Sequence, residues 1–210
     1  FGFGGNNAHL IVEEYEGPST LQPTQSAKPS GALAIVGLGA QVGDGEGLKD
    51  LEAALFGARG VGSTRAASTN VSVRGLKFPP RDLEQALGQQ LTMLGSAREA
   101  IEAVGAIDSK RTGVFVGMGC DPAVARYGVR WRLEEWADHW GDLEGDTLRA
   151  KEDEAVAQLE SPGVLGTMPN VVANRLSSQF DFAAQGFTLS SEELSGVRAL
   201  EVAMRSLRAG

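Results

Sequence analysis

The chain has 210 residues, of which 42% are hydrophobic and 22% charged, a composition typical of a globular α/β protein. Its 19 basic and 27 acidic residues give a net charge of −8, which argues against nonspecific binding to nucleic acid or to an anionic membrane surface. No apolar run approaches the roughly 18 residues that a membrane helix needs, so we expect no membrane partner.

The first 31 residues predict the end of one domain and a linker. Residues 1–16 form a glycine-rich turn, Phe1-Gly2-Phe3-Gly4-Gly5, followed by a strand through Val12 and by acidic residues. Residues 17–31 contain three prolines, three serines and two threonines but few apolar residues, so they are expected to remain a linker. Because residues 1–16 are too short to fold alone, we interpret them as the C-terminal tail of an upstream domain, and both ends of the sequence look cut.

Residues 32–210 then predict alternating strands and helices. Ala32–Val36 is a short apolar run before glycines, which favours a buried strand, whereas Leu83–Val104 carries apolar residues at helical spacing. The expected elements, in chain order, are a strand over 32–36, a helix over 48–56, a loop over 57–75, a helix over 83–104, a strand over 112–118, helices over 126–140, 150–159 and 171–180, a strand over 186–189 and a helix over 194–207. This alternation indicates an α/β fold with a mostly parallel sheet, left incomplete by having about three strands.

Two cofactor interpretations are disfavoured. Gly37, Gly39 and Gly43 suggest a dinucleotide-binding turn, but the third glycine comes one residue late and no acidic residue follows at the usual strand end. The single cysteine, Cys120, excludes an intrachain disulfide and a cysteine-based zinc site, and it is compatible with a reducing cytoplasm. We expect no metal and no cofactor to be bound by this chain, and Cys120 to be a half-buried structural residue.

Several segments resemble the β-ketoacyl synthase (ketosynthase) family of polyketide and fatty-acid megasynthases. Residues 1–14 resemble its C-terminal signature, and the resemblance implies that Phe1, Gly2, Phe3, Gly4 and Gly5 line the acyl pocket of an upstream ketosynthase. Further similar segments follow in the family's order: 32–39, Pro79-Pro80, Gln89-Gln90, 112–117, 170–175, 180–182, 187–189 and 197–210. The resemblance implies a thiolase-like fold, of which residues 32–210 would be the N-terminal part only.

The chain departs from that family at the nucleophile. Active members carry a cysteine between the last of these strands and the helix after it, and ungapped alignment places Glu193 there. A helix N-terminus favours a thiolate, but it equally stabilises a carboxylate, by roughly 0.3–1 kcal/mol. A carboxylate is a far poorer nucleophile toward a thioester, so we expect no intact catalytic residue. Glu192 and Glu193 would also simply cap the helix.

Segments 74–83 and 186–196 are similar to the chain length factor of polyunsaturated fatty acid synthases. That resemblance implies an inactive domain that forms a pseudo-dimer with an active ketosynthase and shapes the tunnel for phosphopantetheine-carried acyl groups. Two alternatives stay open. If Glu193 were buried and protonated, it could donate to an enolate oxygen as in the glutamine-type decarboxylases of malonyl-carrier protein. The domain could also be purely architectural.

The predicted helix over 126–140 allows two interpretations. Arg126, Arg130 and Arg132 are candidate contacts to the partner domain or to an acidic acyl carrier protein. Alternatively, the apolar residues at helical spacing on the same segment pack onto the domain's own core, which is the interpretation that the pattern favours.

Overall fold

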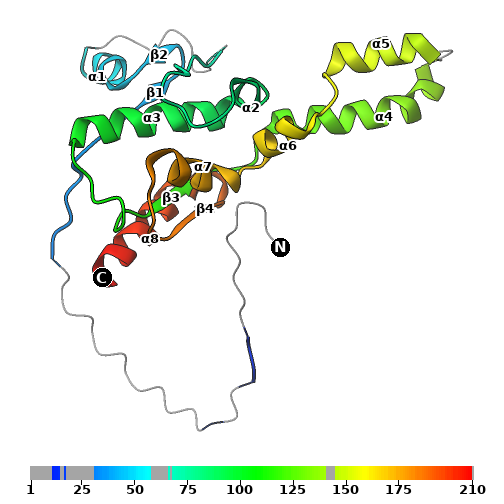
Figure 1. Cartoon of the computed structure of the whole chain (residues 1–210). Helices are drawn as coiled ribbons and strands as arrows, with labels where there is room; N and C mark the ends of the chain where they lie inside the picture. The colour runs from blue at the N-terminus through cyan, green and yellow to red at the C-terminus, as the bar shows by residue number, and fades with distance from the viewer. Residues whose placement is uncertain are drawn as a thin grey trace.

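The computed structural model describes residues 11–14, 17, 31–57, 66, 68–140 and 145–209. The helices are α1 Leu48–Phe56, α2 Pro80–Glu84, α3 Gly88–Val104, α4 Ala125–Trp140, α5 Gly145–Ala155, α6 Ser161–Thr167, α7 Val171–Phe180 and α8 Ser195–Ala209 (Figure 1). The strands are β1 Gln41–Val42, β2 Gly45–Glu46, β3 Val114–Gly117 and β4 Gly186–Leu189, and the short 3-10 helices are η1 Pro122–Val124 and η2 Glu192–Leu194. None of the described helices is both long and apolar enough to cross a bilayer.

The centre of the fold is the parallel pair β3–β4, as the sequence predicted. Val114 lies opposite Gly186, and Gly117 lies opposite Leu189. Because alternate residues of a strand point to opposite faces, Val116 contacts the core formed with α7, whereas the α-carbon of Gly117 faces α8. The helices α7 and α8 therefore cover opposite faces of the pair.

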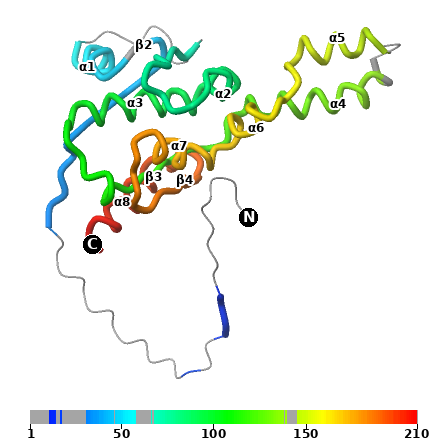
Figure 2. Tube along the Cα trace, in the orientation of Figure 1, coloured from blue at the N-terminus to red at the C-terminus, as the bar shows by residue number. Residues whose placement is uncertain are grey.

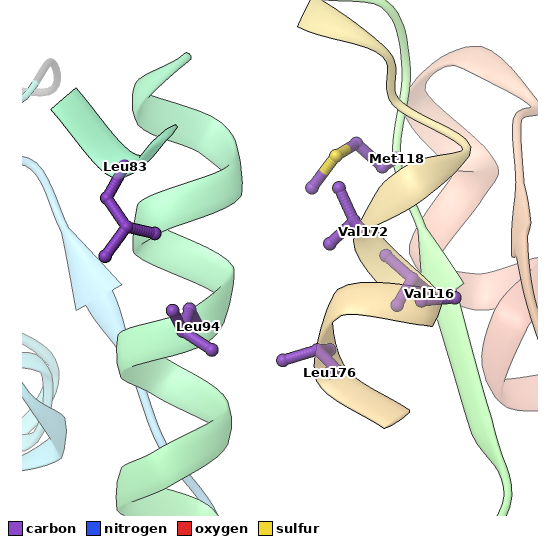
Figure 3. Close-up of a cluster of buried hydrophobic side chains, with 7 residues drawn as sticks. Leu83, Leu94, Val116, Met118, Val172 and Leu176 are labelled. Carbon is purple, nitrogen blue, oxygen red and sulfur yellow. The ribbon is translucent and has the colours of Figure 1, made fainter. Parts of the chain in front are cut away.

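The apolar core lies on the α7 face of this pair. Leu83 of α2 and Leu94 of α3 belong to one cluster with Met118, Val116 and residues of α7, which Figure 3 shows on the other side of it. The buried members of this cluster are Leu83, Leu94, Val116, Met118, Val172, Ala173 and Leu176. The expected amphipathic helices therefore do supply the core, although the described sheet has only two strands in its parallel part.

The predicted strand over 32–36 is wrong in this structure. The segment has no strand assignment, and the side chains of Ile35 and Val36 are 75% and 71% exposed. It is followed by glycines that touch α3 closely, since a Cβ at Gly39 would lie 2.0 Å from the Ser96 carbonyl oxygen. An apolar run forms a buried strand only where a neighbouring strand pairs with it, and no described strand does so here.

The predicted helix over 83–104 is divided into α2 and α3. Pro80 begins α2, and Leu87 has extended backbone angles, φ −61° and ψ 143°, so the helix is interrupted before Gly88. The Leu87 N–H instead donates to the carbonyl of Gly166, 3.0 Å away. That contact ties the break to α6, a short helix that the sequence pattern did not predict although Pro162 stands at its start.

The helices over 126–140 and 150–159 were predicted correctly in kind but not in extent. They form the antiparallel pair α4–α5, which extends away from the sheet (Figure 2). Arg130 holds the pair together: its Nη1 donates to Asp153 Oδ1 at 2.7 Å and to the Val156 carbonyl at 2.9 Å, with Glu152 3.9 Å from its other nitrogen. The Arg130 cation therefore lies beside the last turn of α5, which ends at Ala155, and stabilises that turn.

Glu99 fixes the loop that precedes α1. Its Oε2 accepts from the Ala40 N–H at 2.9 Å, and its Oε1 accepts from the Leu48 N–H at 2.8 Å. The first residue before α1 is Gly47, which has no side chain to cap the helix, so a carboxylate from α3 supplies the cap instead.

We expect Glu99→Ala to expose this loop. Loss of two charge-assisted hydrogen bonds should lower the local free energy of opening by about 2 kcal/mol. Hydrogen exchange of the amides of Ala40 and Leu48 in the full-length protein measures this directly. Glu102→Ala, one turn further along α3 at an exposed site, is the control, and equal acceleration in both variants would contradict the role of Glu99.

Candidate functional site

The site begins at the elbow between β4 and α8. After Leu189 the chain passes through two serines into η2 and then directly into the 15-residue α8. The buried Ser195 fixes this turn, because its hydroxyl donates to the Glu192 carbonyl at 2.6 Å and accepts from the Ser191 N–H at 2.9 Å. The Leu194 N–H closes the turn on the Ser191 carbonyl at 2.9 Å.

Glu193 lies on this elbow, within η2, and its side chain is exposed. The residue before it, Glu192, has a left-handed backbone with φ 49°, which is uncommon for a residue other than glycine or asparagine. Sequence reasoning missed this feature, since a glutamate gives no signal of a left-handed turn. The two carboxylates therefore lie at the end of α8 that carries its partial positive charge.

The position of the elbow depends on Gly117. A Cβ at Gly117 would lie 2.2 Å from the Ser195 carbonyl oxygen and 2.5 Å from the Gly196 nitrogen. Only a residue without a side chain lets the first turn of α8 approach the end of β3 this closely. Because β3 and β4 are parallel, their carboxyl ends and the elbow lie at one edge of the sheet.

Cys120 follows β3 at this same edge but not on the elbow. Its thiol is exposed and lies 3.9 Å from the Asp121 carbonyl, in the loop before η1. The expectation of a half-buried cysteine was wrong, because the chain turns outward after Met118 and leaves Cys120 outside the core. Among the described residues, no group of three or more histidine, cysteine or carboxylate side chains could hold a metal ion.

A cavity of about 600 Å³ opens beside the carboxyl end of β3. Its walls come from the loop after the glycines at 37 and 39, from one side of α3 and from the end of β3. The lining residues are Gly39, Ala40, Gln41, Val42, Gln89, Thr92, Met93, Ser96, Gly117, Met118 and Gly119. Such a mixed wall, at the carboxyl ends of parallel strands, is where α/β folds commonly bind ligands.

The three candidate arginines are not brought together. Arg130 is used within the chain, by its contacts to α5, and only a fifth of its side chain is exposed. Arg126 and Arg132 are exposed, but six residues of helix place them about 120° apart around the axis, so they face different sides of α4. The remaining candidates, Phe1, Gly2, Phe3, Gly4 and Gly5, lie outside the described residues.

Two other motif residues have structural roles. The buried Gln90 Nε2 lies within 3.1 Å of the carbonyls of Leu165, Gly166 and Met168, which joins α3 to α6. Arg175, 6% exposed, stacks over the Phe78 ring at 5.0 Å, and burial lowers the pKa of its guanidinium while the charge of Asp82 raises it. Both residues of these resembling segments therefore join elements of the fold.

Comparison with known proteins now identifies the family. The chain is 26% identical to one of the polyunsaturated fatty acid synthase subunits of Thraustochytrium sp., in an alignment that covers all of this chain and 12% of the relative. The chain therefore spans about an eighth of that relative's length. The family described as "Beta-ketoacyl synthase, N-terminal domain" matches residues 59–210. Because that match covers more than half of the chain, the protein belongs to the β-ketoacyl synthase family.

Proposed function

We propose that residues 32–210 are part of a ketosynthase-like domain that lacks the condensing nucleophile and sets acyl-chain length, in the manner of a chain length factor. The whole protein would then be a component of a polyunsaturated fatty acid or polyketide synthase. Residues 1–16 would be the tail of an active ketosynthase whose acyl pocket includes Phe1 and Phe3, and residues 17–31 would link the two domains. Its substrates would be acyl groups carried on phosphopantetheine.

The observation that carries this proposal is Glu193 on the elbow. Acyl transfer needs a thiolate at the helix N-terminus, but a carboxylate occupies that turn. An acyl carboxylate would be a labile anhydride rather than a stable intermediate. Cys120 would not replace the missing nucleophile, because it lies outside the elbow. It precedes the three-residue η1 rather than the start of α8.

The partner would dock at the outer edge of the sheet. β4 pairs with β3 on one side, and no other described strand covers its second edge. Phe187 of β4 is 38% exposed and contacts Phe115 edge to face at 5.2 Å. An open strand edge beside an exposed aromatic ring supports pairing with a second, similar domain, the active ketosynthase. Arg126 and Arg132 remain candidate contacts to an acyl carrier protein.

The cavity beside β3 would form part of the acyl tunnel. Its apolar residues, Val42, Met93 and Met118, suit an acyl chain, and methionine side chains adapt readily to the shape of a flexible ligand. Enlarging this wall should therefore lengthen the product. We expect Met118→Ala in the full-length synthase to shift the product distribution toward longer chains, measured by mass spectrometry of released fatty acids. A second experiment exchanges the whole domain for that of another synthase. If the chain length of the product changed in neither experiment, the architectural alternative would be favoured.

Glu193→Cys tests the lost nucleophile directly. If the full-length second domain lacks the histidines that work with the cysteine, we expect the variant to take up acyl groups slowly and to give no condensation above background; His139 of α4, the histidine among the described residues, does not lie at the elbow. Condensation is measured with malonyl- and acyl-carrier protein in a synthase whose upstream ketosynthase nucleophile is mutated. Full activity of the unmodified second domain in that background would refute the proposal.

The same assay separates the decarboxylase alternative. That activity needs a protonated Glu193, but the side chain is exposed to water rather than buried. We expect no release of carbon dioxide from malonyl-carrier protein above the rate of a Glu193→Ala control. Release that depends on Glu193 would assign the domain to the decarboxylases instead.

A further inference from the structure

A smaller cavity lies between the turn before α2 and the carboxyl half of α3. It measures about 270 Å³ and is lined by Arg74, Gly75, Arg98, Ile101, Glu102 and Phe180. Two arginine residues thus line one concave site on a chain whose net charge is −8. We call this site the arginine pocket.

The two arginines are not used by ion pairs within the described structure. The ion pairs found there involve other cations, among them Lys77, Arg81 and Arg130. Arg98 has one hydrogen bond, from its Nη1 to the Ser72 carbonyl at 3.3 Å, which leaves most of its five N–H donors available. The nearby Lys77 forms an ion pair, with its Nζ 2.6 Å from Asp181 Oδ1, so we do not expect it to bind an anion in the pocket.

The turn that carries Arg74 is held in place beforehand. Gly75 has a left-handed φ of 78°, and the Leu76 N–H donates to the Val73 carbonyl at 3.1 Å. The nearly buried Gln179 of α7 then clamps the turn: its Nε2 donates to the Gly75 carbonyl, and its Oε1 accepts from the Lys77 N–H, each at 2.9 Å. A fixed backbone lowers the entropic cost of presenting Arg74 to a ligand.

The charge and shape of the pocket select its ligand. Two guanidinium groups against the single carboxylate of Glu102 leave a net positive site, which favours an anion with several oxygens. Ile101 and Phe180 give it an apolar wall that suits the organic part of an ester. We propose that the arginine pocket binds a phosphate group, either as the free ion or as a phosphate monoester such as that of phosphopantetheine.

Titration calorimetry of the full-length protein with inorganic phosphate, at low ionic strength, tests this. We expect each of Arg74→Gln and Arg98→Gln to weaken one phosphate site about tenfold, and the double variant to lose one equivalent of binding. Arg111→Gln is the matched control, because that exposed arginine lines a different cavity and should leave the isotherm unchanged. Hydrogen exchange of α3 verifies that the variants are folded.

Competition identifies the source of the phosphate. If phosphopantetheine binds more tightly than inorganic phosphate and displaces it, the ligand of the pocket is the phosphate ester. If inorganic phosphate binds at least as tightly as phosphopantetheine, the ligand is the free ion. An isotherm unchanged in the double variant, or acetate binding as well as phosphate does, would overturn the proposal. These outcomes do not depend on Glu193, so phosphate binding by the arginine pocket is tested separately from the proposed chain-length role.

Discussion

Replacing Gly117 with alanine should displace the start of α8 and destabilise its packing on β3 by about 3 kcal/mol or more. The added Cβ would lie 2.2 Å from the Ser195 carbonyl oxygen and 2.3 Å from its carbonyl carbon. Both atoms belong to the backbone, so no side-chain rotation relieves the clash. The helix must move as a unit, and the elbow with Glu193 must move with it.

Gly119→Ala is the matched control for this experiment. Gly119 lies two residues further along the same segment, and a Cβ there would have no atom within 4 Å. Alanine at 119 should change stability by less than about 1 kcal/mol. Hydrogen exchange of the first turn of α8 in the full-length protein, compared between the two variants, gives the measurement. Similar protection in both would mean that α8 is not seated on β3 as described.

The helices and strands could be predicted from the sequence where the residue pattern of the segment itself determines the element. α1 and α7 have the predicted limits because their apolar residues repeat at helical spacing. β4 was predicted to the residue, since Gly186–Leu189 lies between turns and is short and apolar. In each case the local residue pattern was enough to predict the element, although β4 also depends on β3 as its pairing strand.

The sequence failed where distant contacts decide the structure. The break before Gly88 depends on the Leu87 contact to Gly166, 79 residues further along the chain, which no local pattern reveals. Distant contacts also decide the structure of the segment over 32–36. This segment has the composition of a buried strand, but no described strand pairs with it, and Ile35 is exposed. Composition predicts that a segment can be buried, but the remaining structure decides whether it is.

The role of Glu193 in the candidate site stays a prediction, but its place in the fold was predicted correctly. Glu193 was placed at a strand-to-helix elbow, and the structure has it there. The three arginines were treated as one surface because they are close in sequence, but helical geometry separates them and Arg130 pairs with α5. The arginine pocket was not anticipated, because Arg74 and Arg98 line one cavity only in the folded chain, where Gln179 holds the turn that carries Arg74.

Replacing Gln90 with leucine is expected to separate α3 from α6. Gln90 is 1% exposed, and its Nε2 lies 2.7 Å from the Gly166 carbonyl and 3.1 Å from the carbonyls of Leu165 and Met168. One amide group has two protons for these three acceptors, so it forms about two full hydrogen bonds. Its Oε1 is buried without a hydrogen-bond partner among the described residues, so leucine removes that cost while it loses the two bonds. At about 1 kcal/mol for each term, leucine should lower the local stability by about 1 kcal/mol, or about fivefold in amide exchange of residues 161–168.

The adjacent Gln89 provides a control of the same residue type on the same helix. Its Nε2 is buried without a hydrogen-bond partner among the described residues, so that polar group is a cost rather than a gain. Gln89→Leu should therefore leave exchange of α6 unchanged or slow it slightly. If both leucine variants opened α6 equally, side-chain volume rather than hydrogen bonding would explain the effect. A difference confined to Gln90 would instead show that the hydrogen bonds of its side chain hold α3 and α6 together.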